Sequence, residues 1–353
     1  MAISQAAIDD LARKGAARGV DLRPALAAFE GRLQRQVTAD LPLVTEASRY
    51  LLDAGGKRFR PMLVLLAGAV GGCPPTDDRL LDAAVVVELV HLSTLYHDDV
   101  IDAADTRRGR ASAHVRWSNT VAILTGDFLL ARASELSAAL GVEVTRVMAR
   151  TIADLCTGQI REVQASEQAR HHGAQPLALG GWASEARREH HLRVIDEKTA
   201  SLIAASCRLG ALLSGQGPRA VETLTRYGRH LGRAFQLADD VLDVTGQPGE
   251  SGKSPGTDLR EGVHTLPVLL ALEAEGPDSE LAGLLAHPLD GGHDQRALAI
   301  LRAHPAMELA RDAARLEAAK ATRALDALAP DASAEAAVEG LAVLTDYAID
   351  RVR

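Results

Sequence analysis

Aromatic residues are scarce in this chain of 353 residues, where Phe, Trp and Tyr together make up 3%, and the formal net charge is −8. Nucleic-acid binding depends on a basic surface and on rings that stack with bases, so the composition argues against a nucleic-acid partner. Cysteine is also scarce. Cys73, Cys156 and Cys207 are odd in number and far apart, which argues against a disulfide framework or a CxxC zinc site and fits a reducing, cytoplasmic compartment.

Long uncharged runs are missing as well. The longest, Pro61 to Thr76, has 16 residues and contains glycines and prolines, whereas a membrane-spanning helix needs ~20 apolar residues. The N-terminal segment has acids and bases but no apolar core of the signal-peptide type. We therefore expect a soluble protein that makes at most peripheral contact with a membrane.

Segments of alternating apolar and polar residues, typical of β-hairpins, are absent, whereas Ala-rich and Leu-rich segments with helical periodicity recur along the chain. This pattern predicts an all-α fold. Residues 1–22 look like a weakly ordered N-terminal extension, and no linker divides residues 23–353, so we expect a single domain there. One helix is expected over residues 26–54, ending at Gly55 and Gly56.

The most informative stretch is LYHDDVIDAADTRRG, residues 95–109, which places Asp98, Asp99 and Asp102 at the end of an apolar segment. On a helix these offsets put three carboxylates on one face, where like charges repel. A solvated acidic face is the simplest reading of such a motif. The functional reading is a Mg²⁺ site, because hard oxygen ligands without Cys or His favour that ion.

A second motif favours the functional reading. The segment FQLADDVLDVTG repeats the arrangement 141 positions further along, with Asp239, Asp240 and Asp243. Basic residues follow each motif: Arg107 and Arg108 after the first, and Lys253 after the second. Six carboxylates and nearby cations fit a cluster of divalent ions that holds a diphosphate.

Three more segments complete a family pattern, in chain order with the two acidic motifs: GGKRFRP from Gly55, GDFLLARA from Gly126, and EKTASL from Glu197. With these motifs the chain resembles the trans-isoprenyl (polyprenyl) diphosphate synthases over roughly residues 40–350. The resemblance implies a bundle of long helices around a central cavity. Its pattern is closest to the synthases that make long chains.

The resemblance also implies roles for individual residues. Lys57, Arg60, His91 and Arg108 are expected to hold isopentenyl diphosphate, and Arg58 of the same basic loop is also expected to bind a diphosphate. Helix-end charge compensation for the loop, and a core position for His91, stay open as alternatives. The residues expected to contact the allylic diphosphate or take part in catalysis beside Asp98, Asp102 and Asp239 are Arg107, Lys198, Thr199, Gln236 and Lys253.

The implied reaction is a head-to-tail (1′-4) condensation of isopentenyl diphosphate with an allylic diphosphate, with three Mg²⁺ ions when substrate is bound and a homodimer as the working form. Two alternatives stay open. A class I terpene cyclase would lack the basic loop around Lys57 and Arg60. A non-catalytic subunit of a heteromeric synthase would generally lose one acidic motif, and both are intact here.

Product length is expected to depend on the helix that carries the first motif. Ser93 and Thr94 lie about one turn, ~5.4 Å, before Asp98, and both are small, whereas relatives that stop at farnesyl length tend to carry an aromatic residue at one of these positions. A long product is therefore predicted, with geranylgeranyl or farnesyl length as the alternative. The histidines His171, His172, His190 and His191 are expected to lie in a solvated loop over 166–188 and just beyond it.

Overall fold

The computed structural model describes residues 20–172, 184–246, 255–286, 292–328, 334–350 and 352. By packing, the chain forms two compact units, which we describe separately. The first unit comprises Met1–Ile152, Leu202–Gly228 and Arg323–Leu344, and the second comprises Ala153–Ser201, Arg229–Thr322 and Thr345–Arg353. The expected N-terminal extension, residues 1–22, falls almost wholly outside the described residues, and the single-domain organisation stays a prediction.

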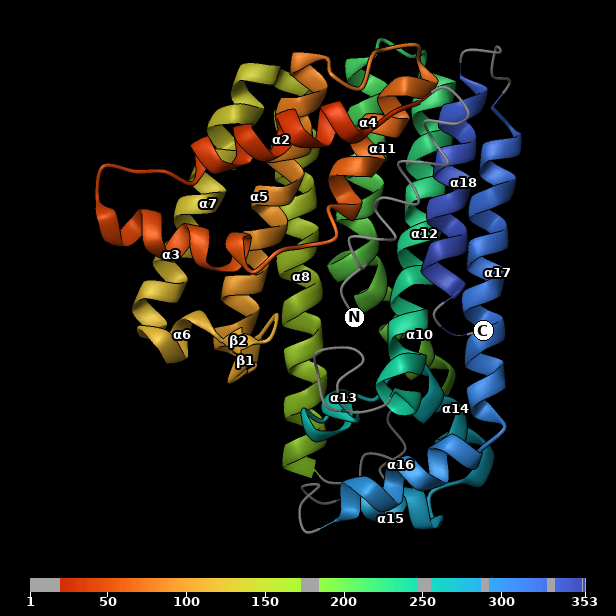
Figure 1. Cartoon of the computed structure of the whole chain (residues 1–353). Helices are drawn as coiled ribbons and strands as arrows, with labels where there is room; N and C mark the ends of the chain where they lie inside the picture. The colour runs from red at the N-terminus through yellow and green to blue at the C-terminus, as the bar shows by residue number, and fades with distance from the viewer. Residues whose placement is uncertain are drawn as a thin grey trace. The chain divides into compact units, whose positions relative to one another are not determined.

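The predicted all-α class is confirmed: the described elements are helices apart from one ribbon of two short strands (Figure 1). The first unit contains α2 (Arg23–Gln36), α3 (Pro42–Asp53), α4 (Phe59–Val70), α5 (Asp78–Ile101), β1 (Thr106–Arg107), β2 (Arg110–Ala111), α6 (Ala113–Arg116), α7 (Asn119–Leu140) and most of α11 (Ser201–Leu213). The second unit contains α10 (Ser184–Ile195), the π-helical turn η1 (Asp196–Ala200), α13 (Thr257–Arg260), α14 (Leu266–Glu275), α15 (Glu280–Leu285) and α16 (His293–Ala303). Residues of α8 (Val142–His172), α12 (Pro218–Thr245), α17 (Ala306–Asp326) and α18 (Glu335–Asp350) contribute to both units.

The prediction of one helix over residues 26–54 is wrong. The structure has two helices, α2 and α3, with a break before Pro42. A proline disfavours the helical conformation of the residue before it, and Leu41 is accordingly extended, with φ −82° and ψ 116°. Pro42 itself occupies the first turn of α3, where its missing N–H group costs no intrahelical hydrogen bond.

Helix α5 is the central helix of the first unit and packs against α2, α4 and α7 (Figure 1). Its N-cap is Asp77, whose side chain accepts hydrogen bonds from the backbone of Arg79 and Leu80. Near its other end, the buried Tyr96 hydroxyl donates to Ala47 O and accepts from Leu51 N, which fixes α5 against α3. In the described residues α5 alone is long and apolar enough to cross a membrane, but 72% of that window is buried, as in a core helix.

The small residues after Lys198 serve close helix packing, as their spacing suggests. A Cβ atom at Gly210 in α11 would lie 2.2 Å from Val64 O in α4, and one at Gly228 in α12 would lie 2.8 Å from Cα of Ala204. Real Cβ atoms do not approach other atoms so closely, so only glycine permits these helices to pack as they do.

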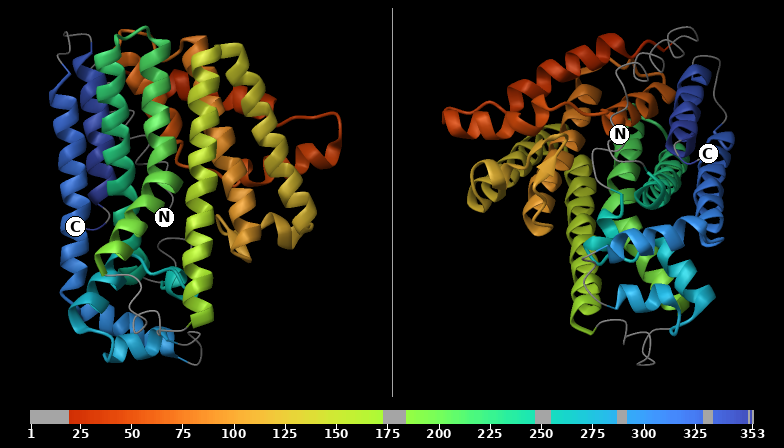
Figure 2. Two further views of the ribbon diagram at one scale, coloured as in Figure 1. Left: turned by 180° about the vertical axis from the view of Figure 1, so that it is seen from behind. Right: turned by 60° about the horizontal axis from the view of Figure 1, so that its bottom comes forward.

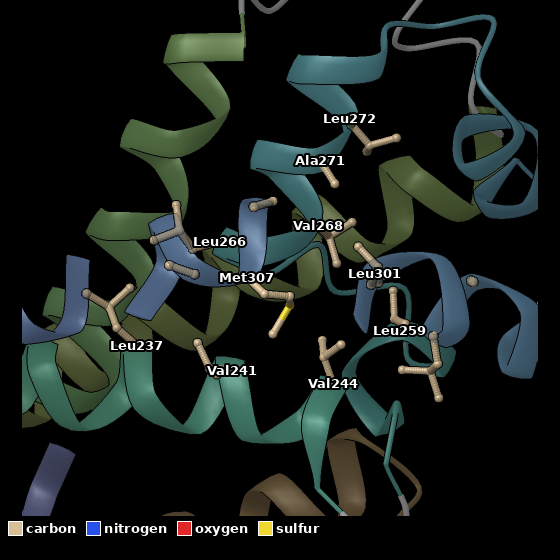
Figure 3. Packing of buried hydrophobic residues seen from close by; sticks show 14 of the residues in the cluster. Leu237, Val241, Val244, Leu259, Leu266, Val268, Ala271, Leu272, Leu301 and Met307 are labelled. Carbon is tan, nitrogen blue, oxygen red and sulfur yellow. The ribbon is translucent and has the colours of Figure 1, made fainter. Parts of the chain in front are cut away.

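The core of the second unit lies where α12 meets α13, α14, α16 and α17. Leu237, Val241 and Val244 recur at helical spacing on α12 and point toward Leu266 and Met307, among other apolar side chains (Figure 3). Helix α16 packs against both α14 and α15 at one end of this unit (Figure 2). This apolar face holds the last turns of α12, which carry the second acidic motif.

Candidate active site

The first acidic motif occupies the last turn of α5. Asp98 and Asp102 are half-buried, and the backbone N–H of Asp102 closes the helix on Asp98 O at 2.8 Å. Asp99 is fully buried, and its Oδ1 accepts a hydrogen bond from Arg107 Nε at 2.6 Å. Its Oδ2 is buried without a hydrogen-bond partner in the described part of the chain. Burial raises the pKa of this carboxyl although Arg107 acts in the opposite direction.

Arg107 and Arg108 lie on a hairpin that the sequence pattern did not reveal. Strands β1 and β2 pair antiparallel, with Arg107 opposite Arg110 and Thr106 opposite Ala111. The two turn residues, Arg108 and Gly109, have positive φ angles of 52° and 73°, which is the requirement of the tight turns that match strand twist. The signal was hidden because the strands are two residues long and polar.

Basic side chains gather in the first unit. They come from the loop before α4, from α5 and from the hairpin: Lys57, Arg58, Arg60, His91, Arg107 and Arg108. The burial of His91 and the surrounding arginines, with Arg60 acting most strongly among them, hold the pKa of its imidazole well below the usual range. Arg108 Nη1 donates to Leu51 O at 2.7 Å and also to Gly55 O, which ties the hairpin to the loop that carries Lys57.

Arg58 does not fit its predicted role as a diphosphate ligand. Its side chain is 9% exposed, and its guanidinium donates to Glu30 Oε1 at 2.5 Å and to Glu88 Oε1 at 2.9 Å. Glu88 is a buried acid in the apolar stretch of α5, and a buried charge requires a partner. Arg58 therefore anchors the loop to the protein through Glu30 and Glu88, and we no longer propose it as a substrate contact.

Arg60 differs from Arg58 because the Nε atom of Arg60 is buried and has no hydrogen-bond partner among the described residues. Burial lowers the pKa of its guanidinium to about 10; Glu88 acts against this shift, and the nearby Arg108 adds to it. A cation in such a position gains stability when an anion binds beside it. This environment supports the prediction that Arg60 binds a diphosphate.

The second acidic motif lies in the last two turns of α12. Asp240 is 1% exposed, its Oδ1 accepts from Gln236 Nε2 at 3.1 Å, and its Oδ2 contacts His191 Nε2 at 2.8 Å. The side chain of Asp243 accepts from the backbone N–H groups of Thr257 and Asp258, at the start of α13. Asp239 is half-buried, on the face that follows from its i, i+4 relation to Asp243.

Lys198 and Thr199 lie in η1, where the N–H of Ser201 bonds to Asp196 O five residues earlier. Turns of this kind occur often at functional sites. Four consecutive residues have partners on α8 or α12: Asp196 with Arg233, Glu197 with Arg161, Lys198 with Glu162, and Thr199 with Gln236.

Two glycines make room for η1 between its neighbours. A Cβ atom at Gly158 in α8 would lie 2.7 Å from Lys198 N, and one at Gly232 in α12 would lie 2.5 Å from Cα of Ala200. The backbone of η1 thus packs closely against both helices.

The prediction that His190 and His191 belong to a solvated loop is wrong. Both lie on α10, and His191 is 9% exposed and touches the second acidic motif through Asp240. The side chains of His171 and His172, and Lys253 with its predicted role at the diphosphate, lie outside the described residues. No spacing rule links residues 191 and 240, so the sequence offered no signal for this pair.

Of the two residues expected to set product length, Ser93 is fully buried and its hydroxyl has no hydrogen-bond partner among the described residues. Thr94 is half-buried, and its hydroxyl donates to His91 O at 2.8 Å. Thr94 is therefore the position where a larger side chain can be accommodated with less distortion of the core.

The donor set of both motifs suits a magnesium-like ion, because it consists of carboxylate oxygens, and Asp99 Oδ2 is a buried oxygen that lacks a partner. In the described residues no group of three or more His, Cys, Asp or Glu side chains converges on one point. In proteins Mg²⁺ is usually held by one or two carboxylates, while substrate phosphates and water complete the coordination. That all six aspartates bind metal stays a prediction; within the protein, both oxygens of Asp240 already have partners, Gln236 and His191.

Comparison with known proteins identifies the family to which this chain belongs. Residues 41–302 match the model of the polyprenyl synthetase family. The chain is 43% identical over 332 residues, 94% of its own length and 93% of the other, to the nonaprenyl diphosphate synthase of Mycobacterium tuberculosis. It is 42% identical over 271 residues, 74% of its own length and 79% of the other, to the heptaprenyl diphosphate synthase component 2 of Geobacillus stearothermophilus.

A solved structure agrees with these relatives. The polyprenyl synthase of Caulobacter crescentus, complexed with calcium and isoprenyl diphosphate, aligns with a TM-score of 0.83 at 31% identity over 94% of this chain and 96% of the other. The chain belongs to the polyprenyl synthetase family. Members of this family depend on a divalent metal ion.

Proposed function

We propose that this chain is a prenyltransferase that condenses isopentenyl diphosphate with an allylic diphosphate, head to tail, to give a long all-trans polyprenyl diphosphate. The class of reaction is inferred from membership of the polyprenyl synthetase family. The isopentenyl diphosphate site is inferred from Arg60: the residue is half-buried, its Nε is buried without a protein partner within the described chain, and desolvation, with Arg108 adding to the shift, lowers the pKa of its guanidinium to about 10.

In the reaction, the allylic C–O bond breaks and its electron pair leaves with the diphosphate. The double bond of isopentenyl diphosphate forms the new C–C bond, and a proton is then lost to the departed diphosphate. No protein nucleophile is needed, in keeping with the absence of a Ser/His/Asp signature. The residues proposed to bear the diphosphate charge are Lys198, Arg107 and, outside the described residues, Lys253.

The proposed metal is Mg²⁺, with three ions when substrate is bound. Asp98 and Asp102 of the first motif and Asp239 and Asp243 of the second would hold them. Bound there, the ions would stabilise the charge on the leaving diphosphate as Lewis acids. In this proposal Asp240 orients the second motif through its contacts with Gln236 and His191, whereas Asp99 is held by Arg107 at Oδ1 and keeps Oδ2 for the first metal site.

A homodimer in the cytoplasm, with at most peripheral membrane contact, completes the proposal. Exposed apolar side chains on the first unit support a dimer: Leu41, Leu43, Val115, Ile123 and Leu124. Light scattering of the purified chain at micromolar concentration tests it, and a monomer would count against the dimer.

The central test is an assay of the purified chain alone with Mg²⁺, isopentenyl diphosphate and allylic primers of increasing length, followed by chromatography of the dephosphorylated products. We expect turnover that is abolished by a chelator and restored by Mg²⁺, with a long product. A chain that is inactive alone but active after addition of a second protein would instead support the alternative of a subunit in a heteromeric synthase, which the similarity to a component 2 makes a specific competitor.

Product length gives a sharper prediction at Thr94. Thr94→Phe is expected to shorten the main product, because the ring would fill space beside α5 one turn (~5.4 Å) from the first motif. Thr94→Val, which removes the hydroxyl and keeps the size, is the matched control and should leave the distribution as in wild type. Chromatography of the products decides, and an unchanged distribution in the Phe variant contradicts the role of this position.

A further inference from the structure

A chain of hydrogen bonds in the second unit joins three elements around the second acidic motif. Thr199 Oγ1 in η1 donates to Gln236 Oε1 at 2.8 Å, Gln236 Nε2 donates to Asp240 Oδ1 at 3.1 Å, and His191 Nε2 on α10 lies 2.8 Å from Asp240 Oδ2. The members come from η1, α12 and α10. The chain thus ends, on the α10 side, at a histidine that has no role in the reaction proposed above.

The direction of each bond is determined by chemistry. An ionised carboxylate can only accept, so the amide nitrogen of Gln236 and the Nε2 proton of His191 must both point at Asp240. The amide oxygen of Gln236 then faces Thr199, whose hydroxyl donates to it. Both oxygens of Asp240 have protein donors, and the residue is 1% exposed, so Asp240 acts within the protein rather than as a direct ligand.

The contact between His191 and Asp240 lies within the second acidic motif on α12. Asp240 immediately follows Asp239, and Asp243 on the next turn accepts hydrogen bonds from the start of α13. The apolar face of α12 with Leu237, Val241 and Val244 holds this segment from one side. His191 supplies a polar contact from another helix, at the middle residue of the motif.

We propose that His191 is a positioning residue for the second acidic motif: through its hydrogen bond to Asp240 it holds α10 to α12 and fixes the orientation in which Asp239 meets a metal–diphosphate. This inference rests on the proposed function. Removal of a hydrogen-bond partner directly behind a metal ligand typically changes metal affinity or activity by about 10- to 100-fold, and because His191 acts one residue further away, through Asp240, we expect an effect at the lower end of this range.

The test compares His191→Leu, which removes the donor at similar size, with His191→Gln, whose amide nitrogen can reach the position of Nε2. Arg193→Ala is the matched control, since Arg193 is exposed on the same helix and pairs with Glu189. For each variant we would measure the Mg²⁺ concentration that gives half-maximal turnover. A second measurement, the rise in Tm produced by Mg²⁺ with inorganic pyrophosphate, does not depend on turnover.

We expect His191→Leu to raise the half-maximal Mg²⁺ concentration about 10-fold or more and to lose most of the Tm rise. His191→Gln should stay close to wild type in both measurements, and circular dichroism should show unchanged helix content. A Leu variant within twofold of wild type, or a Gln variant as impaired as Leu, overturns the positioning role. Should the Leu variant not fold, the Gln variant decides alone: near-wild-type behaviour supports the role, and a 10-fold loss overturns it.

Failure of this inference is distinct from failure of the proposed function. A wild-type chain that neither turns over substrate nor gains Tm with Mg²⁺ and pyrophosphate overturns both. An active wild type with an equally active Leu variant overturns only the role of His191.

Discussion

Replacement of Asp98 or Asp239 by alanine is expected to lower kcat by about 10²- to 10³-fold while the chain stays folded. Each aspartate is the first carboxylate of its motif, is half-buried, and is proposed to hold metal against the leaving diphosphate. Stability should change little, because removal of one carboxylate relieves repulsion between like charges at i, i+4.

The measurement is kcat at saturating Mg²⁺ and both substrates, beside thermal unfolding of each variant. Asp154→Ala, at an exposed position on α8, is the matched control and should keep wild-type turnover. Asp240→Asn is expected to cost less than Asp239→Asn, because an amide at 240 keeps the shape and one acceptor of a buried contact. A variant of Asp98 or Asp239 that retains near wild-type turnover rules out the role assigned to its motif.

Much of this site could be predicted because its residues occur in short local patterns. Two carboxylates at i and i+4 share a helix face wherever the helix lies, so Asp98 and Asp102, or Asp239 and Asp243, needed no tertiary information. The basic loop from Gly55 to Pro61 could be predicted for the same reason, because glycines and cations in one short segment are a local feature.

What the sequence did not reveal depends on pairing between distant residues. Arg58 looks like its neighbours Lys57 and Arg60 until Glu30 and Glu88, 28 and 30 positions away, are found at its guanidinium. A signal existed for Glu88, since a lone acid in an apolar stretch of α5 requires a buried cation. For His191 and Asp240, 49 positions apart, no such signal existed.

The structure thus gives different surroundings to Arg58 and Arg60, which are two positions apart, and this difference can be tested. Arg60→Met is expected to raise the KM for isopentenyl diphosphate by about 10- to 100-fold, since a hydrogen bond to a charged group contributes about 1.5–3 kcal/mol. The KM for the allylic substrate should change little. Stability should be nearly unchanged, because Glu88 keeps Arg58 at 2.9 Å and the repulsion between Arg60 and Arg108 disappears.

Arg58→Met serves as the matched control with the opposite result. It leaves the buried Glu88 without its cation, and breaking a buried pair in this way typically costs about 3–5 kcal/mol of unfolding free energy. Steady-state kinetics with each substrate varied in turn, beside denaturant unfolding, measures both effects. Equal changes in the two KM values for Arg60→Met would show that Arg60 does not distinguish the substrates, and a fully stable Arg58→Met would show that Glu88 does not depend on Arg58, so that the loop is held by other contacts.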